Sequence, residues 1–405
     1  MSKFKSLIGI LSLLVVSVSV NAAEYPTSDV NTTGLAVTDD VVTVGILHSV
    51  TGTMAISESG SVEAEKLAIK QINEMGGVLG RQIEIIQEDG ASDWPTFAEK
   101  AKKLLVKDKV ASVFGCWTSA SRKAVLPVFE KENGMLYYPT FYEGLEESKN
   151  VIYTGQEATQ QIIAGLDWVK ETKDAKTFYL IGSDYIWPRT SNKIARKHIE
   201  NVLGGKVVGE EYYPLGHTNF GSLINKIKLK KPDVIYSIVV GGSNVSWYKQ
   251  LKAAGITSDK WTLLTISVTE DEMLGIGGEN VEGFYAAMKY FQSLDNPNNQ
   301  AFVSAFKEMW GDDSVIGDVT QAAYLGPWLW KAAVEKAGSF DIDKIAVASN
   351  GIELDTAPEG YVRIHDSNHH LWSKTRIGIA KTDGQFDVIW ESGLIEPDPF
   401  PEGYQ

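Results

Sequence analysis

The chain has a single cysteine among its 405 residues, which excludes an internal disulfide. That residue, Cys116, ends an apolar stretch and has no histidine beside it in the sequence. A free cysteine in such surroundings behaves as a small hydrophobic side chain. We therefore expect Cys116 to be buried in the core rather than to act as a nucleophile.

Motifs that mark common enzymes are also absent from the sequence. There is no G-x-x-x-x-G-K-[ST] phosphate loop, no G-x-S-x-G elbow and no H-E-x-x-H metal motif. Acidic residues are plentiful, but no pair of them is marked as catalytic. Three histidines gather near the C-terminus (His365, His369 and His370) without obvious partner ligands. These observations predict a protein that is not an enzyme and uses no cofactor and no metal.

Positive charge is scarce: the chain has 38 Lys and Arg but 52 Asp and Glu, which gives a net charge of −14. Such a surface repels nucleic acid and anionic lipid, and no basic stripe reverses that effect. We therefore expect neither a nucleic-acid partner nor a stable membrane insertion.

Long apolar runs are limited to the N-terminus. Lys3 and Lys5 precede an apolar stretch over 7–20, and the small residues of Val20-Asn21-Ala22 follow it. This order is typical of a cleaved signal peptide, and the run is too short for a stable transmembrane helix. We assign residues 1–22 to a signal peptide cleaved near Ala22, and expect a periplasmic protein without a lipid anchor.

What the sequence does contain is a regular alternation of strands and helices after a polar lead-in at 23–40, which we expect to be flexible. An amphipathic helix over 61–75, for example, follows an apolar strand over 41–47. Such alternation predicts an α/β fold with mainly parallel sheets flanked by helices. The expected strands are 41–47, 82–87, 110–114, 135–138, 177–181, 206–212, 234–240, 261–266 and 281–288, with a hairpin around Asp383-Gly384.

The pattern restarts near residue 160, and the length suits two domains. We expect a first lobe of 41–158 plus 289–345 and a second lobe of 159–288 plus 346–405. The chain would then cross a hinge between the lobes three times.

Polar and aromatic residues follow neighbouring strands of the first lobe. In open α/β sheets, ligands bind outside the carboxyl ends of the strands. We expect Ser119 to cap a helix and to hold a ligand oxygen with nearby N–H groups, and Thr140 to act similarly one unit later. Glu143 is either a ligand acceptor or a solvated acid. The first-lobe candidates are Trp117, Thr118, Ser119, Tyr138, Thr140 and Phe141.

Corresponding strand ends of the second lobe should face them. Tyr185 and Trp187 are expected to close on the ligand, and Ser267 and Glu270 to accept its N–H groups. Asp184 either orients a donor or caps the following helix. His48 ends the first strand, where a structural role is the more common outcome.

Several segments resemble the type I periplasmic solute-binding proteins of ABC transporters, in the branch that binds urea and short-chain amides. They are VGILHSVTGTMAISES (44–59), EDGASDWPTFAEKAKKL (88–104), GCWTSASRKAVLPVFE (115–130), YYPTFYEG (137–144), GSDYIWPRTSNK (182–193), SNVSWYKQL (243–251), SVTEDE (267–272) and DGQFDVIW (383–390). The resemblance spans about 44–390. It implies two lobes that close over a small neutral ligand, urea, and deliver it to an inner-membrane permease.

One loop departs from that branch. Urea binders usually have YPVQYEG, whereas this chain has Thr140 and Phe141 at the central positions. The added apolar wall makes an acetamide-like amide the alternative ligand. A periplasmic sensor with the same fold and an exported amide hydrolase using Cys116 are the alternatives from other classes.

Overall fold

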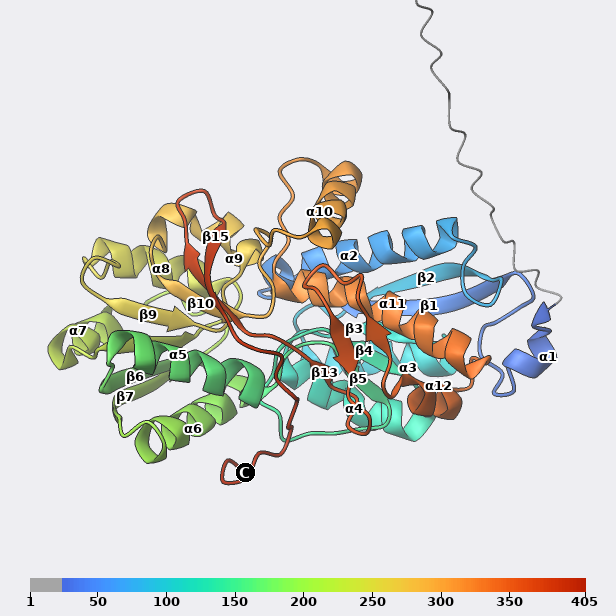
Figure 1. The fold of residues 1–405 in the computed structure, drawn as a ribbon, viewed down its shortest axis with the longest axis horizontal. Helices are drawn as coiled ribbons and strands as arrows, with labels where there is room; N and C mark the ends of the chain where they lie inside the picture. Colours follow the sequence, from blue (N-terminus) through green and yellow to red (C-terminus); the bar gives the residue numbers. More distant parts are fainter. Residues whose placement is uncertain (1–23) are drawn as a thin grey trace, which may run out of the picture.

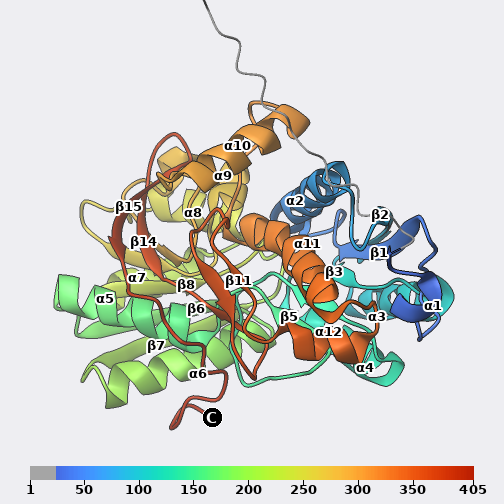
Figure 2. The same cartoon turned by 45° about the vertical axis from the view of Figure 1, so that its right-hand side comes forward.

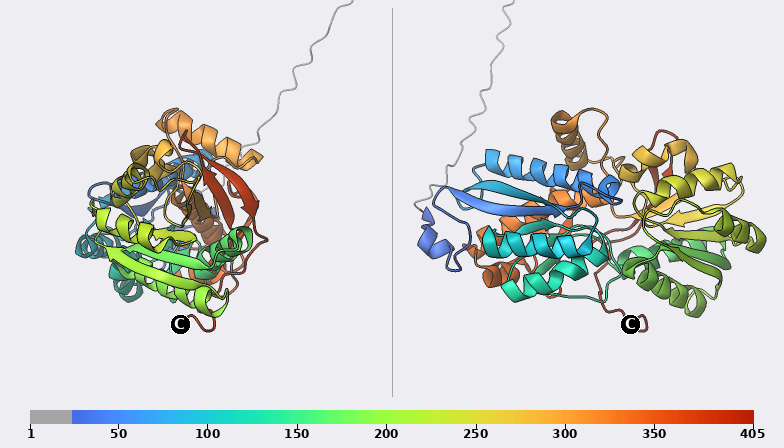
Figure 3. Two further views of the ribbon diagram at one scale, coloured as in Figure 1. Left: turned by 90° about the vertical axis from the view of Figure 1, so that its left-hand side faces the viewer. Right: turned by 180° about the vertical axis from the view of Figure 1, so that it is seen from behind.

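The computed structural model describes residues 24–405, so the predicted signal peptide lies outside the described residues. Two lobes lie side by side, each built on a sheet with helices on both faces (Figures 1 and 3). The predicted α/β class with mainly parallel sheets is confirmed. None of the helices within 24–405 combines the length and the apolar character needed to cross a bilayer.

The first-lobe sheet has the order β2-β1-β3-β4-β5, and all its strands are parallel. One face packs on α2 and α11, and the other packs on α3 and α4. The strands are β1 (Val41–His48), β2 (Gln82–Asp89), β3 (Val113–Gly115), β4 (Leu136–Tyr138) and β5 (Val151–Tyr153). The helices are α2 (Ala55–Glu74), α3 (Trp94–Lys102) with its π-helical turn η2 (Lys103–Lys107), α4 (Ser119–Glu132), α11 (Asp318–Ala337) and α12 (Ile342–Ser349).

The second-lobe sheet has the order β15-β14-β10-β9-β8-β6-β7. Its strands β6 to β10 are parallel, and the β14–β15 hairpin adds an antiparallel edge at the predicted turn. The strands are β6 (Thr177–Ser183), β7 (Lys206–Tyr213), β8 (Val234–Ile238), β9 (Thr262–Thr265), β10 (Tyr285–Met288), β14 (Arg376–Ala380) and β15 (Phe386–Glu391). The helices are η3 (Thr159–Ile163), α5 (Ala164–Lys173), α6 (Ile186–Asn201), α7 (Gly221–Lys230), α8 (Ser243–Ala253), α9 (Glu270–Ile276) and η4 (Gly278–Asn280).

The C-terminal part of the chain corrects one predicted boundary. We assigned 346–405 to the second lobe, yet the chain reaches that lobe's sheet only at β14. Ile352, Val362 and Leu371 are buried in the first-lobe core, because that core offers the apolar surface that covers them. Figure 2 shows β11 beside α11 and α12. Between α12 and β14 the chain forms β11 (Glu353–Leu354), β12 (Val362–Ile364) and β13 (Leu371–Trp372). The helix α10 (Pro297–Trp310) lies earlier in the chain, between β10 and α11.

The polar lead-in is another correction, because its described part is packed rather than flexible. The short helix α1 (Thr27–Val30) and the bridge from Val37 to Val42 attach it to the first lobe. Val30 and Val37 are buried in that lobe's core. The guanidinium of Arg81 also donates to the carbonyl oxygens of Tyr25 and Thr38. These few contacts outweigh the polar composition that suggested disorder.

Candidate functional site

The lobes meet where the carboxyl ends of their parallel strands face each other. The ring centroids of Phe141, after β4, and Trp187, after β6, lie 5.3 Å apart. The Gly242 N–H, after β8, donates to the Thr53 carbonyl oxygen, after β1, at 3.2 Å. The structure is therefore a closed arrangement of the lobes. We call the set Trp117, Thr140, Phe141, Tyr185 and Trp187 the interlobe site.

The β3 end presents Trp117 to this contact. Gly115 permits the turn, because a Cβ there would lie 2.1 Å from the Leu47 carbonyl oxygen. Trp117 is 2% exposed, packs edge-on against Phe141, and its indole Nε1 has no partner within the protein. Thr118, not Ser119 as predicted, caps α4, because its Oγ1 accepts from the Ser121 N–H at 3.0 Å.

Ser119 belongs to a buried charge network behind the site. Its hydroxyl donates to Glu143 and accepts from Arg122 Nη1 at 3.1 Å. Arg122 also donates from Nη2 to Glu143 at 3.3 Å and from Nε to Glu146 at 2.7 Å. Glu143 is therefore neither of the two alternatives considered, since it is a buried partner of Arg122.

The network is electrostatically balanced. Burial opposes ionisation of Glu146, but Arg122 and Lys123 lower the pKa of its carboxyl to about 2. The guanidinium of Arg122 also lies over the rings of Tyr138 and Tyr142, at 4.7 and 4.4 Å from their centroids. Its charge is thus neutralised within the protein.

Of the two candidates at the end of β4, Tyr138 has a hydrogen-bond partner and Thr140 has none. The Tyr138 hydroxyl donates to the Trp117 carbonyl oxygen at 2.6 Å, so this side chain braces the loop that holds Trp117. Thr140 is 2% exposed, and its Oγ1 has no partner. Gly155 passes directly behind it, where a Cβ would lie 2.3 Å from the Thr140 carbonyl oxygen. The hydroxyl of Thr140 is thus a buried group without a hydrogen bond in the loop after β4.

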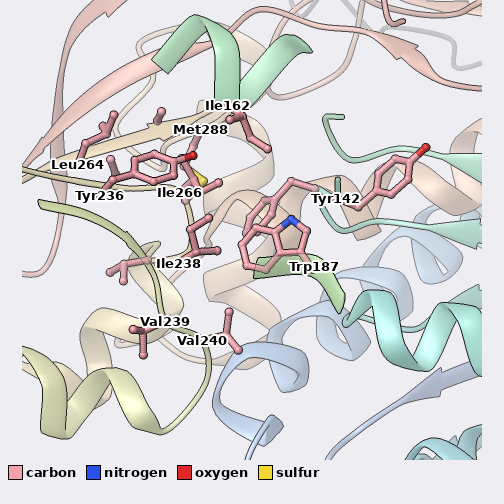
Figure 4. Packing of buried hydrophobic residues seen from close by; sticks show 14 of the residues in the cluster. Tyr142, Ile162, Trp187, Tyr236, Ile238, Val239, Val240, Leu264, Ile266 and Met288 are labelled. Carbon is pink, nitrogen blue, oxygen red and sulfur yellow. The ribbon is translucent and has the colours of Figure 1, made fainter. Parts of the chain in front are cut away.

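In the second lobe, Tyr185 and Trp187 begin α6. The Tyr185 hydroxyl and the Trp187 Nε1 are buried without partners. Burial and the nearby Tyr138 and Glu143 raise the pKa of Tyr185 well above its usual range, so it remains a neutral hydroxyl. Figure 4 shows Trp187 between Tyr142 of the first lobe and Ile238 and Val240 of the second. Asp184 takes neither expected role and instead pairs with Arg189 at 2.6 Å.

The remaining second-lobe candidates, Ser267 and Glu270, have hydrogen-bond partners on the backbone. The Ser267 hydroxyl donates to the Val239 carbonyl oxygen at 2.7 Å. Glu270 accepts from the Gln292 N–H at 2.8 Å, and burial beside Asp271 and Asp318 raises its pKa well above the usual range. Glu270 Oε2 is buried without a partner, so Glu270 keeps an open acceptor, whereas the hydroxyl of Ser267 is satisfied by the backbone. A ligand-binding role for these two residues stays a prediction.

Two polar side chains at the interlobe contact escaped the sequence analysis. Asn244, near the start of α8, is 1% exposed, and neither of its amide atoms has a partner. Its position after a second-lobe strand, like that of Trp117 after β3, was the available signal. Glu58, on α2, is fully buried with one unpartnered carboxylate oxygen. It precedes the predicted helix over 61–75, and only the earlier start of α2 at Ala55 places it on a helix.

His48 lies beside Glu58 in a fully buried cluster. Its Nε2 is 2.9 Å from Glu65 Oε1, and its Nδ1 is 3.6 Å from Glu58 Oε2. Burial lowers the pKa of the imidazole, but the two carboxylates prevail and raise it to about 9. His48 is therefore a buried imidazolium with a structural role.

The three C-terminal histidines have separate organic partners. His370 stacks on Tyr153 at 4.2 Å and pairs with the Tyr142 hydroxyl. His369 Nε2 lies 3.0 Å from the Ala346 carbonyl oxygen, and His365 pairs with Glu396. Across residues 24–405, no group of three or more His, Cys, Asp or Glu side chains is placed to hold a metal ion.

Two lobes that meet over inward-facing polar and aromatic groups define a binding protein. The family model described as "Periplasmic binding protein domain" matches residues 42–405, and the chain belongs to this family. Its fold is that of the type I periplasmic binding proteins, as predicted. Membership of a family of binding proteins agrees with the expectation that the chain is not an enzyme.

The relatives are distant. The leucine-, isoleucine-, valine-, threonine- and alanine-binding protein of Pseudomonas aeruginosa is 28% identical over 331 residues, or 80% of this chain and 86% of that protein. A Geobacillus stearothermophilus protein named limonene hydroxylase is 40% identical over 119 residues, or 29% of this chain, and the match spans only 21% of that relative. So short a match transfers no activity.

Solved structures show the same fold. A solute-binding protein of an ABC transporter from R. palustris, in complex with 4-hydroxybenzoate, has a TM-score of 0.80 at 23% identity and covers 90% of this chain and 100% of its own. The leucine-binding protein LivK of Thermotoga maritima has a TM-score of 0.76 at 23% identity, and the match covers 86% of this chain and 98% of that protein.

Proposed function

We propose that this protein is the solute-binding component of an ABC importer, exported to the periplasm by residues 1–22, and that it captures urea. A short aliphatic amide such as acetamide is the alternative ligand. Binding would stabilise the closed arrangement of the lobes, which an inner-membrane permease would then recognise.

The observation that supports this proposal is the set of unpartnered polar atoms at the interlobe site. Trp117 Nε1 and Thr140 Oγ1 come from the first lobe, and the Tyr185 hydroxyl and Trp187 Nε1 from the second. A buried polar group without a hydrogen bond costs free energy, so a ligand that bridges these atoms gains that energy in the closed form. A small molecule with both a carbonyl oxygen and N–H groups suits such a set.

The charges around the site favour a neutral ligand over the carboxylates bound by several structural neighbours. Arg122, the cation behind Ser119, is occupied by Glu143 and Glu146. Aromatic rings of both lobes also close against each other, which favours a compact ligand. Phe141 supplies the apolar wall that would pack a methyl group, and this wall favours the acetamide alternative.

Isothermal titration calorimetry of the mature protein tests the proposal. The ligands are urea, formamide, acetamide, propionamide, leucine and 4-hydroxybenzoate. Tight binding of urea with weak binding of acetamide supports the urea assignment. Preference for acetamide or propionamide moves the protein to short-amide uptake or sensing. Binding of leucine or 4-hydroxybenzoate without any amide would overturn the proposal.

A further inference from the structure

Glu58 combines complete burial with an unused hydrogen-bond acceptor. The residue lies in the first turn of α2 and is 0% exposed. Its Oε2 accepts from the Ser49 N–H at 2.6 Å and faces His48. Its Oε1 has no partner within the protein. One carboxylate oxygen is thus fixed by the first lobe, while the other remains open.

The start of α2 lies against the second lobe. The Thr53 carbonyl oxygen accepts from Gly242, and a Cβ on Gly275 would lie 2.6 Å from Ile56. On either side of Glu58, a Cβ on Gly241 would lie 2.8 Å from the sulfur of Met54, and a Cβ on Gly60 would lie 3.2 Å from Asp271 Oδ1 of α9. Glu58 therefore adjoins the interlobe site from the first-lobe side.

The unpartnered atoms differ in hydrogen-bond character. The two indole groups of Trp117 and Trp187 only donate, and the hydroxyls of Thr140 and Tyr185 can donate or accept. Burial raises the pKa of the Glu58 carboxyl, whereas His48 and the Ser49 N–H act to lower it, and in its ionised form the carboxylate only accepts. A primary amide brings N–H donors as well as a carbonyl oxygen. The unpartnered groups at the interlobe contact that are obliged to accept a hydrogen bond are Glu58 Oε1 in the first lobe and the amide oxygen of Asn244 in the second.

We propose that Glu58 is a specificity-determining residue whose Oε1 accepts N–H donors of the bound ligand. This inference rests on the proposed function and deepens it, since it assigns the acceptor half of the site. Indole and hydroxyl donors face the ligand oxygen, and Glu58 faces its nitrogen. A carboxylate ligand would meet Glu58 oxygen to oxygen and be repelled.

The test is Glu58→Gln in the mature protein, titrated with urea, acetamide, acetate, leucine and 4-hydroxybenzoate. The amide side chain keeps the size of Glu58 and an acceptor for Ser49. Its NH2 group turns a donor toward the ligand N–H. We expect amide affinity to fall about 10- to 100-fold, as for a hydrogen bond to a charged group. The ratio of the acetamide affinity to the acetate affinity should also fall.

Glu65→Gln is the matched control. Like Glu58→Gln, it removes a carboxylate charge that pairs with His48. Glu65 lies seven residues further along α2 and therefore about 10 Å away along the helix axis. We expect its amide affinity to stay within about threefold of the wild type, since no ligand contact is lost. Thermal unfolding of both variants checks that they fold.

The outcomes separate this inference from the proposed function. Unchanged amide affinity in Glu58→Gln overturns the inference while the function stands. Binding of leucine without amides overturns the function, and a loss of leucine affinity in Glu58→Gln then supports the acceptor role toward an ammonium group. Binding of 4-hydroxybenzoate alone overturns both. If Glu58→Gln does not fold, equal binding of acetamide and acetate by the wild type overturns the inference.

Discussion

The two sides of the interlobe contact differ in how far their polar groups are satisfied within the protein. On the first-lobe side, Ser119, Tyr138 and Glu143 are held by hydrogen bonds to one another's loops and to Arg122. On the second-lobe side, the Tyr185 hydroxyl, Trp187 Nε1 and the Asn244 amide have no partner. Trp117 Nε1 and Thr140 Oγ1 of the first lobe are also unpartnered. The comparison indicates that the first lobe combines a prebuilt platform with a few open groups, whereas the polar groups of Tyr185, Trp187 and Asn244 in the second lobe all remain for a ligand to satisfy.

The largest expected effect concerns the platform. Arg122→Met leaves Glu143 buried without a counter-charge and Glu146 paired with Lys123 alone, and we expect the free energy of unfolding to fall by about 3 to 5 kcal/mol. Thermal unfolding is the suitable measurement, because urea is a proposed ligand. The control Arg189→Met removes the exposed pair with Asp184 and should cost at most about 1 kcal/mol. Equal losses would contradict a charge-dependent platform.

The pH dependence of stability follows from His48 on the same side. Its pKa in the folded protein is raised to about 9, above the unfolded value near 6.5, so the folded state binds more protons between these values. The stabilisation is fully present below about pH 6.5 and is lost as pH rises through 9, for a change of about 3 kcal/mol. Melting temperatures between pH 6 and 10 measure it. A slope that persists unchanged in His48→Gln would show that another group is responsible.

A pair of tyrosines contrasts the two sides directly. Tyr185→Phe deletes an unpartnered hydroxyl, and we expect ligand affinity to fall about tenfold with no loss of stability. Tyr138→Phe deletes the bond to Trp117 and should cost about 1 kcal/mol of stability. Calorimetric titration and thermal unfolding of both variants provide the comparison. The contrast fails if Tyr185→Phe destabilises as much as Tyr138→Phe.

The smallest expected effect separates two hydroxyls of the first lobe. Thr140→Val keeps the shape and removes an unpartnered hydroxyl, so affinity should fall about fivefold while stability is retained. Ser119→Ala removes a bond to Glu143 and should lower stability by about 1 kcal/mol with little change in affinity. If Ser119→Ala weakens binding more than Thr140→Val does, the hydroxyl of Ser119 contacts the ligand, as the sequence first suggested.

Local pattern was sufficient for most of the fold. The strand over 82–87 and the hairpin at Asp383-Gly384 lie where alternation and turn residues predicted them. Helix α2 was less well predicted: it begins at Ala55 rather than 61, and Met75, the last residue of the predicted amphipathic helix, is 68% exposed. The strand β5 was not predicted.

Part of the candidate site was also accessible from sequence, because strand ends in an α/β chain are positions of known meaning. Trp117, Thr140, Tyr185 and Trp187 were selected on that basis. The rings of Trp117, Tyr185 and Trp187 are linked by ring contacts through Phe141, and the binding role of the four residues stays a prediction. Ser267 and Glu270 were selected by the same rule; the backbone engages the Ser267 hydroxyl and one carboxylate oxygen of Glu270, while Glu270 Oε2 is unpartnered. The end of a strand fixes the position of a residue in the fold. The residues packed around its side chain then determine which hydrogen bonds that side chain makes.

The sequence by itself determined the alternation of strands and helices, the loops that carry hydroxyls and aromatics, and the acidic net charge, because these follow from nearest-neighbour chemistry. Tertiary structure alone decided which polar groups are already satisfied and which remain open. It paired Arg122 with acids 21 and 24 residues away, and it buried Glu58 at the contact between lobes. Burial and hydrogen-bond partnership depend on segments distant in the chain, so no local pattern encodes them.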